Sequence, residues 1–272
     1  MGMGCADAHA ARYGMRARGR RSMHGTHEMN PAWWDLFDPD TPNDVILRSV
    51  LIGRCPGLAV LDRRRNPKQV AIRAHGGKAF ASVGAQEGFL QGALDRMTHL
   101  GWTALADAGV PESVRRRGRV VDRARFEDCD LESAALRSLR AALPPGFDRR
   151  PLDRELFRRC HHAERELPAE YGDKLDSYFG FGYGVCLLHG GDVVCEAYAG
   201  FVAEGRMEAV AGTAEPFRDR GLATIASAYL AEEARRRGQT FSWNCLADNL
   251  GSLKVARRLG FRTEWSYREI YL

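Results

Sequence analysis

Apolar residues recur along this chain with two spacings, and the spacing separates expected helices from expected strands. Residues 221–237 carry apolar side chains three and four positions apart, the period of one helix face, and Gly238 follows as a stop signal. Short apolar runs between turn residues predict strands. The predicted strands are residues 58–62, 69–74, 78–83, 102–106, 184–189, 192–201, 206–213, 240–245 and 262–272. The other predicted helices are residues 45–53, 86–100, 111–117, 153–165 and 250–259. Helices interleaved with strands predict an α/β fold, or α+β, with a mixed sheet.

Breaks in this pattern predict the domain organisation. Residues 143–146 (Leu-Pro-Pro-Gly) interrupt it and indicate a boundary. We therefore expect a smaller α/β domain over residues 29–145 and a second domain over residues 146–272. Residues 1–28 show neither a helical nor a strand period, which predicts a disordered tail, with Met29 as a candidate natural start. Because that stretch is rich in arginine, the alternative is an arm that binds a polyanion.

Composition and charge exclude several classes of protein. With 44% apolar and 28% charged residues among 272, the chain has the balance of a soluble globular protein. No apolar run is long enough for a membrane span, and the Arg-rich start lacks the apolar core of a signal peptide. The seven cysteines are scattered without a Cys-x-x-Cys pair, so we expect free thiols in a reducing cytoplasm. Most of the net charge of +5 lies in the first 28 residues, so we expect no nucleic-acid or membrane partner for the folded part.

The most informative segment is residues 208–224 (Glu-Ala-Val-Ala-Gly-Thr-Ala-Glu-Pro-Phe-Arg-Asp-Arg-Gly-Leu-Ala-Thr), which predicts a strand, a turn and a helix start. Gly221 and Ala223 are small enough for a ligand to approach the backbone. Unpaired N–H groups in the first turn of a helix bind phosphate oxygens, and Arg218 and Arg220 add positive charge there. The segment therefore predicts a pyrophosphate site at residues 218–224. The alternative is a tight strand-to-helix turn that binds nothing.

Two motifs in this half resemble the GCN5-related N-acetyltransferase (GNAT) superfamily. Arg-x-x-Gly-x-Ala at residues 218–223 matches the family's (Gln/Arg)-x-x-Gly-x-(Gly/Ala) motif. Downstream, Asn249 opens the next predicted helix and residues 260–261 (Gly-Phe) close it, as in the second signature. Residues 182–272 resemble the superfamily strongly. Residues 30–272 more loosely resemble its two-domain branch, which includes zwittermicin-resistance-type acetyltransferases.

The resemblance implies that the chain binds acetyl-CoA. In this family the pantetheine lies beside a splayed strand, here residues 208–213, where backbone N–H groups also polarise the thioester carbonyl. The pyrophosphate lies on the following loop and helix start. Asn249 matches a position that binds the cofactor arm, and its alternative role is a helix N-cap. The implied cofactor-binding residues are Ala211, Gly212, Thr213, Arg218, Asp219, Arg220, Gly221, Leu222, Ala223, Thr224 and Asn249.

Acetylation of an amine needs a base, and the sequence offers two carboxylates. Glu208 lies on the strand beside the expected thioester, where partial burial would raise its pKa. Its alternative role is a surface residue of the strand, and Glu196 on the preceding strand is the second candidate base. The family often protonates the departing thiolate with a Tyr one turn before Gly-Phe, but this chain has Ala256 there. The remaining candidates for that step are Ser252, Tyr229, Tyr267 and water.

Taken together, these features predict an acetyl-CoA-dependent N-acetyltransferase acting on a small-molecule or peptide amine. Family analogy suggests an antibiotic as one such acceptor. Because Ala256 replaces the usual Tyr, the alternative is a CoA-binding protein without acetyl transfer, whose N-terminal domain serves regulation or self-association. No metal site is predicted: residues 160–162 (Cys-His-His) fall in an expected helix, where adjacent side chains point in different directions. Trp243 lies near the expected acceptor cleft and is predicted to be a core residue.

Overall fold

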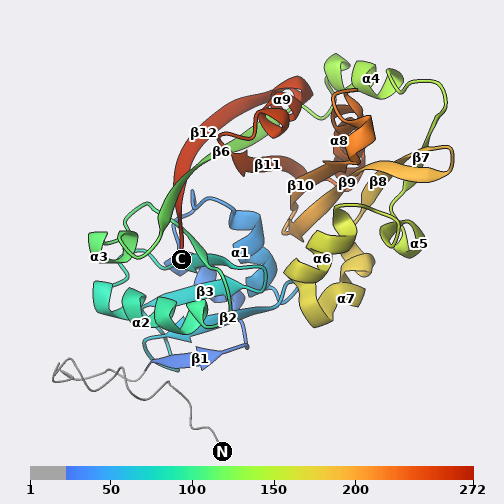
Figure 1. Ribbon diagram of the computed structural model, residues 1–272. Helices are drawn as coiled ribbons and strands as arrows, with labels where there is room; N and C mark the ends of the chain where they lie inside the picture. The colour runs from blue at the N-terminus through green and yellow to red at the C-terminus, as the bar shows by residue number, and fades with distance from the viewer. Residues whose placement is uncertain (1–22) are drawn as a thin grey trace, which may run out of the picture.

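One mixed sheet of twelve strands runs through the described chain, residues 23–272 of a computed structural model (Figure 1). The strand order is β1-β2-β3-β4-β5-β12-β6-β11-β10-β9-β8-β7. Both parallel and antiparallel pairs occur, and helices lie against both faces. The predicted mixed α/β class is therefore confirmed.

The N-terminal half is a group of short strands between helices. Its strands are β1 (His24–Thr26), β2 (Gly57–Leu61), β3 (Val70–Ala74), β4 (Lys78–Ala81) and β5 (Ala104–Ala106). Its helices are η1 (Pro31–Leu36), α1 (Asp44–Leu51), α2 (Glu87–Thr98) and α3 (Glu112–Arg115). Alternate residues of β2 point to opposite faces, so Val60 packs with α2 while Ala59 packs with α1.

The second half carries the longer strands. They are β6 (Arg119–Cys129), β7 (Phe147–Pro151), β8 (Gly184–His189), β9 (Asp192–Ala203), β10 (Arg206–Thr213), β11 (Thr240–Leu246) and β12 (Phe261–Tyr271). Its helices are α4 (Ala134–Ala141), α5 (Arg154–Phe157), α6 (Ala163–Tyr171), η2 (Gly172–Lys174), α7 (Leu175–Phe181), η3 (Glu215–Phe217), α8 (Leu222–Arg236) and α9 (Leu250–Leu259). Helix α8 covers one face of β10 through Met207 and Ala209, while α6 and α7 pack on the opposite face of the sheet.

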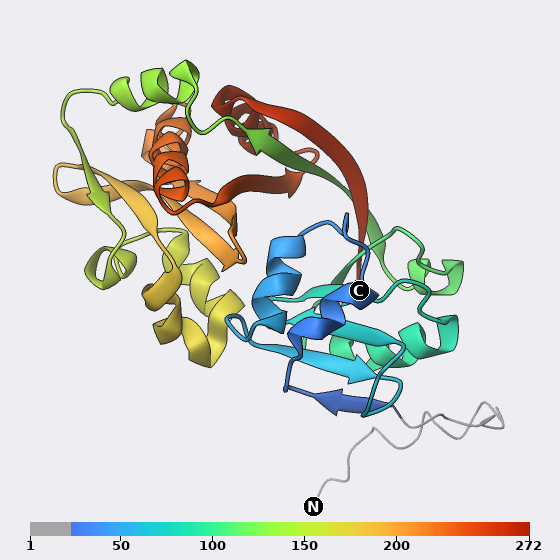
Figure 2. The same cartoon turned by 180° about the vertical axis from the view of Figure 1, so that it is seen from behind.

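Strand β12 joins the two halves. It pairs with β6 along most of its length and with β5 at its end, where Glu269 lies opposite Ala106. In Figures 1 and 2, β6 and β12 form a long curved ribbon between the two groups of elements. Helix α1 adds a second connection, because Leu47 and Val50 share a core with Phe201 of β9. The halves therefore pack as one body.

The first described residues belong to the sheet, which corrects part of the predicted tail. The sequence analysis assigned residues 1–28 to that tail, and residues 1–22 lie outside the described residues. Strand β1 pairs antiparallel with β2, with His24 opposite Leu61, and His27 Nδ1 lies 2.8 Å from the Gly57 carbonyl oxygen. A strand of three residues is too short to show a period, so only its pairing reveals it.

The helix predicted over residues 153–165 is two helices with a break. Asp153 caps α5 as expected, since its Oδ1 accepts from the Leu156 N–H at 2.8 Å, but α5 ends at Phe157 and α6 begins at Ala163. The break is stabilised from outside the segment. The Glu196 carboxylate accepts from the backbone N–H groups of His162 (2.5 Å) and Ala163 (3.4 Å), which are unpaired at a helix start.

Residues 119–143 contribute to the core of the second half, although the sequence analysis placed them before the boundary at residue 145. Ala124 and Phe126 of β6 face this core. Leu136 of α4 is fully buried there, and the Tyr229 hydroxyl of α8 donates to the Arg140 carbonyl at 2.7 Å. Strand β6 was missed because its arginines and carboxylates obscure the apolar alternation.

Candidate active site

The site begins where β10 and β11 separate. The two strands are parallel neighbours only from Arg206 opposite Thr240 to Ala209 opposite Trp243. Beyond Ala209, β10 continues to Thr213 and pairs only with β9. A register shift between Glu208 and Ala209 accompanies the change. Residues 210–213 therefore present one edge of backbone N–H and C=O groups without a neighbouring strand.

The loop after β10 turns the chain into α8. Asp219 (φ +61°) and Gly221 (φ +77°) both adopt the left-handed conformation, and Gly221 is the N-cap of α8 with no side-chain cap. The first-turn N–H groups of α8 are therefore available to a ligand. A Cβ at Gly221 would meet only Arg258 Nη1, at 3.9 Å, so the loop is open there. Arg218 Nε donates to the Thr213 carbonyl at 3.3 Å.

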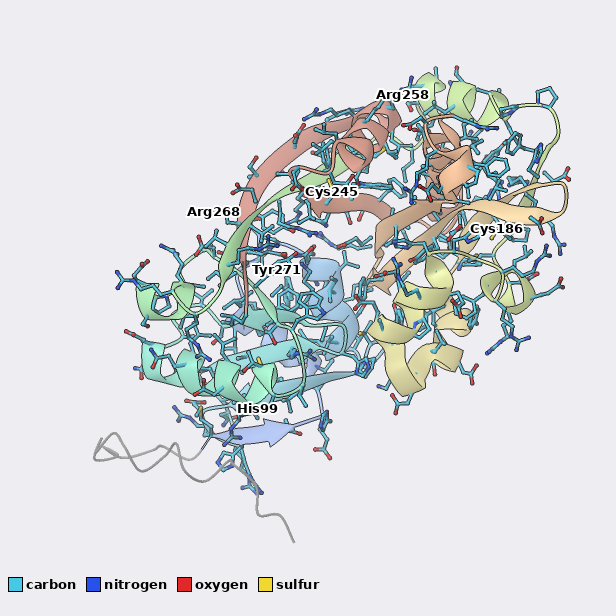
Figure 3. The ribbon with its side chains drawn as sticks, viewed as in Figure 1. His99, Cys186, Cys245, Arg258, Arg268 and Tyr271 are labelled. Carbon is cyan, nitrogen blue, oxygen red and sulfur yellow. The ribbon has the colours of Figure 1, made fainter. Side chains whose placement is uncertain are left out.

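Helix α9 forms the second wall. Asn249 Oδ1 accepts from the Ser252 N–H at 3.0 Å, so Asn249 is the N-cap of α9. Trp243 Nε1 donates to Ser252 Oγ at 2.9 Å, so Trp243 is both a core residue, as expected, and part of this wall. Lys254 and Arg258 face the same space from α9, and Figure 3 shows Arg258 on that helix.

The break between α5 and α6 supplies the third wall, which the sequence analysis did not predict. His161, His162 and Arg165 line the space there. A Cβ at Gly212 would lie 2.5 Å from the Cβ of His162, so the glycine permits this close approach. His162 Nδ1 lies 3.0 Å from the Tyr198 hydroxyl. A continuous helix was expected here, so the two histidines were not placed near β10.

Together the three walls enclose a cavity of about 620 Å³. Its composition fits coenzyme A: a free strand edge for the pantetheine amides, helix-start N–H groups for the pyrophosphate, and cations from two elements. Of the residues predicted to bind the cofactor, those brought together are Ala211, Gly212, Thr213, Arg218, Asp219, Gly221, Leu222, Ala223, Thr224 and Asn249. Arg220 is not among the lining residues. Its guanidinium lies over the Phe217 ring at 5.0 Å and donates to the Pro216 carbonyl at 3.1 Å.

The two candidate bases have different surroundings. Glu196 is fully buried, and one carboxylate oxygen is engaged by the N–H groups that start α6. Glu208 is 8% exposed, and its Oε2 is buried with no hydrogen-bond donor among the described residues. Burial raises the pKa of Glu208 to about 7, although the positive charges of Lys78 and Arg123 oppose the shift. A carboxylate with that pKa can take up and release a proton near neutral pH.

The side chains considered for protonating the thiolate lie in different parts of the structure. Ala256 is fully buried in the core beneath α9. Tyr229 donates to the Arg140 carbonyl, on the α4 side of α8. The Tyr267 hydroxyl lies 3.4 Å from the side-chain oxygens of Asn43 and Asn244. Ser252 lines the cavity, and its Oγ accepts from Trp243, which leaves its own hydrogen to donate.

Comparison with known proteins now identifies the family. A model of the GNAT acetyltransferase family matches residues 36–270. The chain belongs to the GNAT acetyltransferase family. It is 28% identical over 129 residues to an uncharacterized N-acetyltransferase, YdfB, of Bacillus subtilis (strain 168), covering 47% of this chain and 49% of that protein. The chain thus spans about half the length of this curated relative.

Solved structures of GNAT proteins share the fold. A GCN5-related N-acetyltransferase-like protein from Streptococcus suis 89/1591 is 24% identical, with a TM-score of 0.69 over 89% of this chain and 97% of its own. A GCN5-related N-acetyltransferase from Sphaerobacter thermophilus is 15% identical, with a TM-score of 0.56 over 92% and 94%. The expected GNAT fold is therefore confirmed.

Two features are absent from residues 23–272 of this GNAT protein. No helix in that range is both long and apolar enough to cross a membrane. Nor does that range bring three or more His, Cys, Asp or Glu side chains into an arrangement that could hold a metal ion.

Proposed function

We propose that this protein is an acetyl-CoA-dependent N-acetyltransferase that transfers the acetyl group directly to the amine of a small molecule or peptide. One observation carries the proposal. Along the chain, the free edge of β10 beyond Ala209 lies between Glu208, whose carboxylate is buried and does not line the cavity, and the open helix-start loop at Gly221. The residues proposed for donor binding, thioester polarisation and proton removal thus lie on one strand or directly after it.

The donor half of the site follows from backbone geometry. Acetyl-CoA supplies an activated acetyl thioester. The edge of residues 210–213 offers hydrogen bonds to its pantetheine amides, and N–H groups of residues 218–224 bind its pyrophosphate. Arg218, Lys254 and Arg258 line the cavity and balance the phosphate charge. Asn249 caps the start of α9, which lies beside the same ligand.

Transfer requires two proton movements. Glu208 takes a proton from the acceptor amine, whose nitrogen forms a bond to the acetyl carbon as the carbon–sulfur bond breaks. Ser252 passes a proton from water to the departing sulfur, because its hydrogen is the one not used by Trp243, and Glu208 afterwards returns its proton to solvent. The products are the acetylated amine and free coenzyme A. The nitrogen gives up one proton for each acetyl group that it receives.

The donor site is tested by two substitutions at Gly221. Gly221→Glu places a negative charge at the proposed pyrophosphate position, where like charges repel by roughly several kcal/mol, and should abolish acetyl-CoA binding. Gly221→Ala is the matched control, because it introduces the same left-handed backbone strain without the charge. Calorimetric titration of both folded variants decides. Equal acetyl-CoA affinity in Gly221→Glu and Gly221→Ala would remove the proposed donor site.

Transfer is tested by Glu208→Gln in a thiol-release screen with acetyl-CoA and pooled amines, antibiotics and peptides. Gln keeps the shape but cannot accept a proton, so the rate should fall by roughly 10²–10⁴-fold. Acetyl-CoA affinity should stay unchanged. Glu164→Gln, an exposed carboxylate of α6, serves as the control and should keep its rate. A Glu208→Gln variant as active as the control would show that Glu208 is not the base.

A second candidate function is CoA binding without transfer, with the N-terminal half serving regulation or self-association. It is favoured by Ala256, which is fully buried and cannot donate a proton. The same screen separates the two candidates. Binding of acetyl-CoA with no thiol release from any amine would favour this second function.

Two broader assignments accompany the proposal. We place the protein in the two-domain GNAT branch that includes zwittermicin-resistance-type acetyltransferases, because an N-terminal α/β half precedes the catalytic half. We also propose a cytoplasmic location, which free thiols support. The described cysteines, Cys55, Cys129, Cys160, Cys186, Cys195 and Cys245, form no disulfide.

A further inference from the structure

His162, at the break before α6, is held by β9 through both its backbone and its ring. Its N–H donates to Oε1 of the buried Glu196 at 2.5 Å. Its Nδ1 lies 3.0 Å from the hydroxyl of Tyr198, a residue that is 1% exposed. Although His162 is the N-cap of α6, its side chain makes no capping hydrogen bond to that helix. The ring is therefore fixed in place without being needed to start α6.

The Tyr198 hydroxyl decides which ring nitrogen of His162 carries the hydrogen. Burial raises the pKa of Tyr198 well above its usual value, so the phenol keeps its proton. Within the described chain, the acceptor for that proton is Nδ1 of His162. If Nδ1 donated instead, the buried phenol hydrogen would have no acceptor, which is costly. Nδ1 is therefore the acceptor, and in the neutral ring Nε2 carries the hydrogen.

This N–H is accessible from the cavity beside the free edge of β10. His162 lines the cavity, and its Nε2 is not among the described side-chain atoms that are buried without a partner. A Cβ at Gly212 would lie 2.5 Å from the Cβ of His162 and 3.1 Å from its Cγ, the first ring atom. Tyr198, which holds the far side of the ring, lies opposite Val210 in the β9–β10 pair. The ring therefore lies beside residues 210–212, where the donor is proposed to bind.

A neutral N–H at this place suits an oxygen that gains negative charge during the reaction. In acetyl transfer the thioester oxygen does so, because the acceptor nitrogen attacks the carbon to which it is bound. Nε1 of Trp243, a neutral N–H on the α9 side of the cavity, already donates to Ser252. Nε2 of His162 has no such acceptor within residues 23–272 and can serve the acetyl oxygen.

We propose that His162 donates a hydrogen bond from Nε2 to the acetyl oxygen of bound acetyl-CoA and so completes the oxyanion hole. This inference rests on the proposed acetyl transfer. As the nitrogen bonds to the acetyl carbon, the carbonyl electron pair moves onto the oxygen, where Nε2–H and the N–H groups of β10 stabilise it. The pair returns when the carbon–sulfur bond breaks. His162 keeps its proton throughout, and Glu196 and Tyr198 act as positioning residues.

The first test compares the binding of acetyl-CoA with that of CoA, which lacks the acetyl oxygen, by calorimetric titration. His162→Phe keeps a ring without an N–H, and His162→Gln, the matched control, keeps an N–H near the position of Nε2. His162→Phe should reduce the preference for acetyl-CoA over CoA by about threefold or more, as expected for one hydrogen bond. His162→Gln should keep that preference within about twofold. With a reactive amine, kcat should fall by about 10²-fold in His162→Phe and by less than about tenfold in His162→Gln.

A measurement on the wild type makes the test independent of how His162→Phe folds. In nitrogen NMR of protein labelled with ¹⁵N-histidine, a ring nitrogen that carries hydrogen is distinguished from a bare one by its chemical shift. At neutral pH the hydrogen of His162 should be on Nε2, and this resonance should move more with acetyl-CoA than with CoA. A hydrogen on Nδ1, equal movement with both ligands, or an undiminished acetyl-CoA preference in folded His162→Phe would overturn the inference and leave the proposed transferase standing. Failure of the wild type to bind acetyl-CoA would overturn both.

Discussion

At the scale of single residues, Glu196 and Glu208 show how environment separates two similar carboxylates. Both are glutamates on neighbouring strands, and both were candidate bases. Backbone N–H groups at the start of α6 engage Oε1 of Glu196, while Oε2 of both carboxylates is buried without a donor in the described chain. The sequence places both on neighbouring strands, because strand spacing is readable. It does not tell which one is engaged, because the donors to Glu196 come from a segment 33 and 34 residues earlier in the chain.

The raised pKa of Glu208 predicts how stability depends on pH. The pKa is about 7 in the fold against an ordinary 4.5, so the unfolded chain loses this proton first as pH rises. The contribution to stability is complete below about pH 4.5 and is lost by about pH 7–8. Relative to Glu208→Gln, the wild type should therefore lose up to about 3 kcal/mol of unfolding free energy between pH 4.5 and 8. Urea unfolding across that range measures the difference, and parallel curves would contradict it.

At the scale of elements, short helices and strands are stabilised by contacts with neighbouring elements. Helix α5 has four residues and α6 contains Pro168, so neither is strong alone. Strand β1 has three residues and exists through its pairing with β2. These elements were missed or misjudged from sequence because local period and propensity carry little information over so few residues.

Removal of β1 should destabilise the N-terminal half. A chain that begins at Met29 lacks the β1–β2 pairing and the Met23 contact with the α2 core. A loss of about 1 kcal/mol shifts the melting temperature by about 2–4 °C in a protein of this size, and we expect a decrease of at least that amount. A chain that begins at Met23 is the control. Thermal unfolding of both chains checks this, and identical melting temperatures would show that β1 contributes nothing.

At the scale of the whole molecule, a buried ionic cluster ties the last strand to the N-terminal half. Lys78 Nζ of β4 lies 2.6 and 2.5 Å from the two carboxylate oxygens of Glu269 on β12. Asn43 Nδ2, just before α1, donates to the same carboxylate at 3.0 Å. Glu269 is 1% exposed. The C-terminal strand thereby holds β4 and the start of α1 in the N-terminal half in place.

Breaking this cluster from one side should be strongly destabilising. Glu269→Ala leaves Lys78 and Arg123 without their shared carboxylate, and removal of one partner of a buried pair costs about 3–5 kcal/mol. Replacing Lys78 as well, as Glu269→Met with Lys78→Met, should recover part of the loss, because Arg123 is then the one cation of the cluster left without the shared carboxylate. Denaturant unfolding of the single and double variants checks the order. A double variant less stable than Glu269→Ala would contradict this account.

The sequence by itself determined what depends on local order along the chain. It predicted the mixed α/β class, the long helix α8, the strands β8 to β12 and the residues of the loop at 218–224. Each of these signals lies within a short stretch of sequence. Tertiary structure alone decided where α6 begins, that β6 lies between β11 and β12, and that His162 lies against Gly212 of β10. Those placements depend on contacts between residues far apart in sequence. Burial, pairing and pKa values arise only when such residues are brought together.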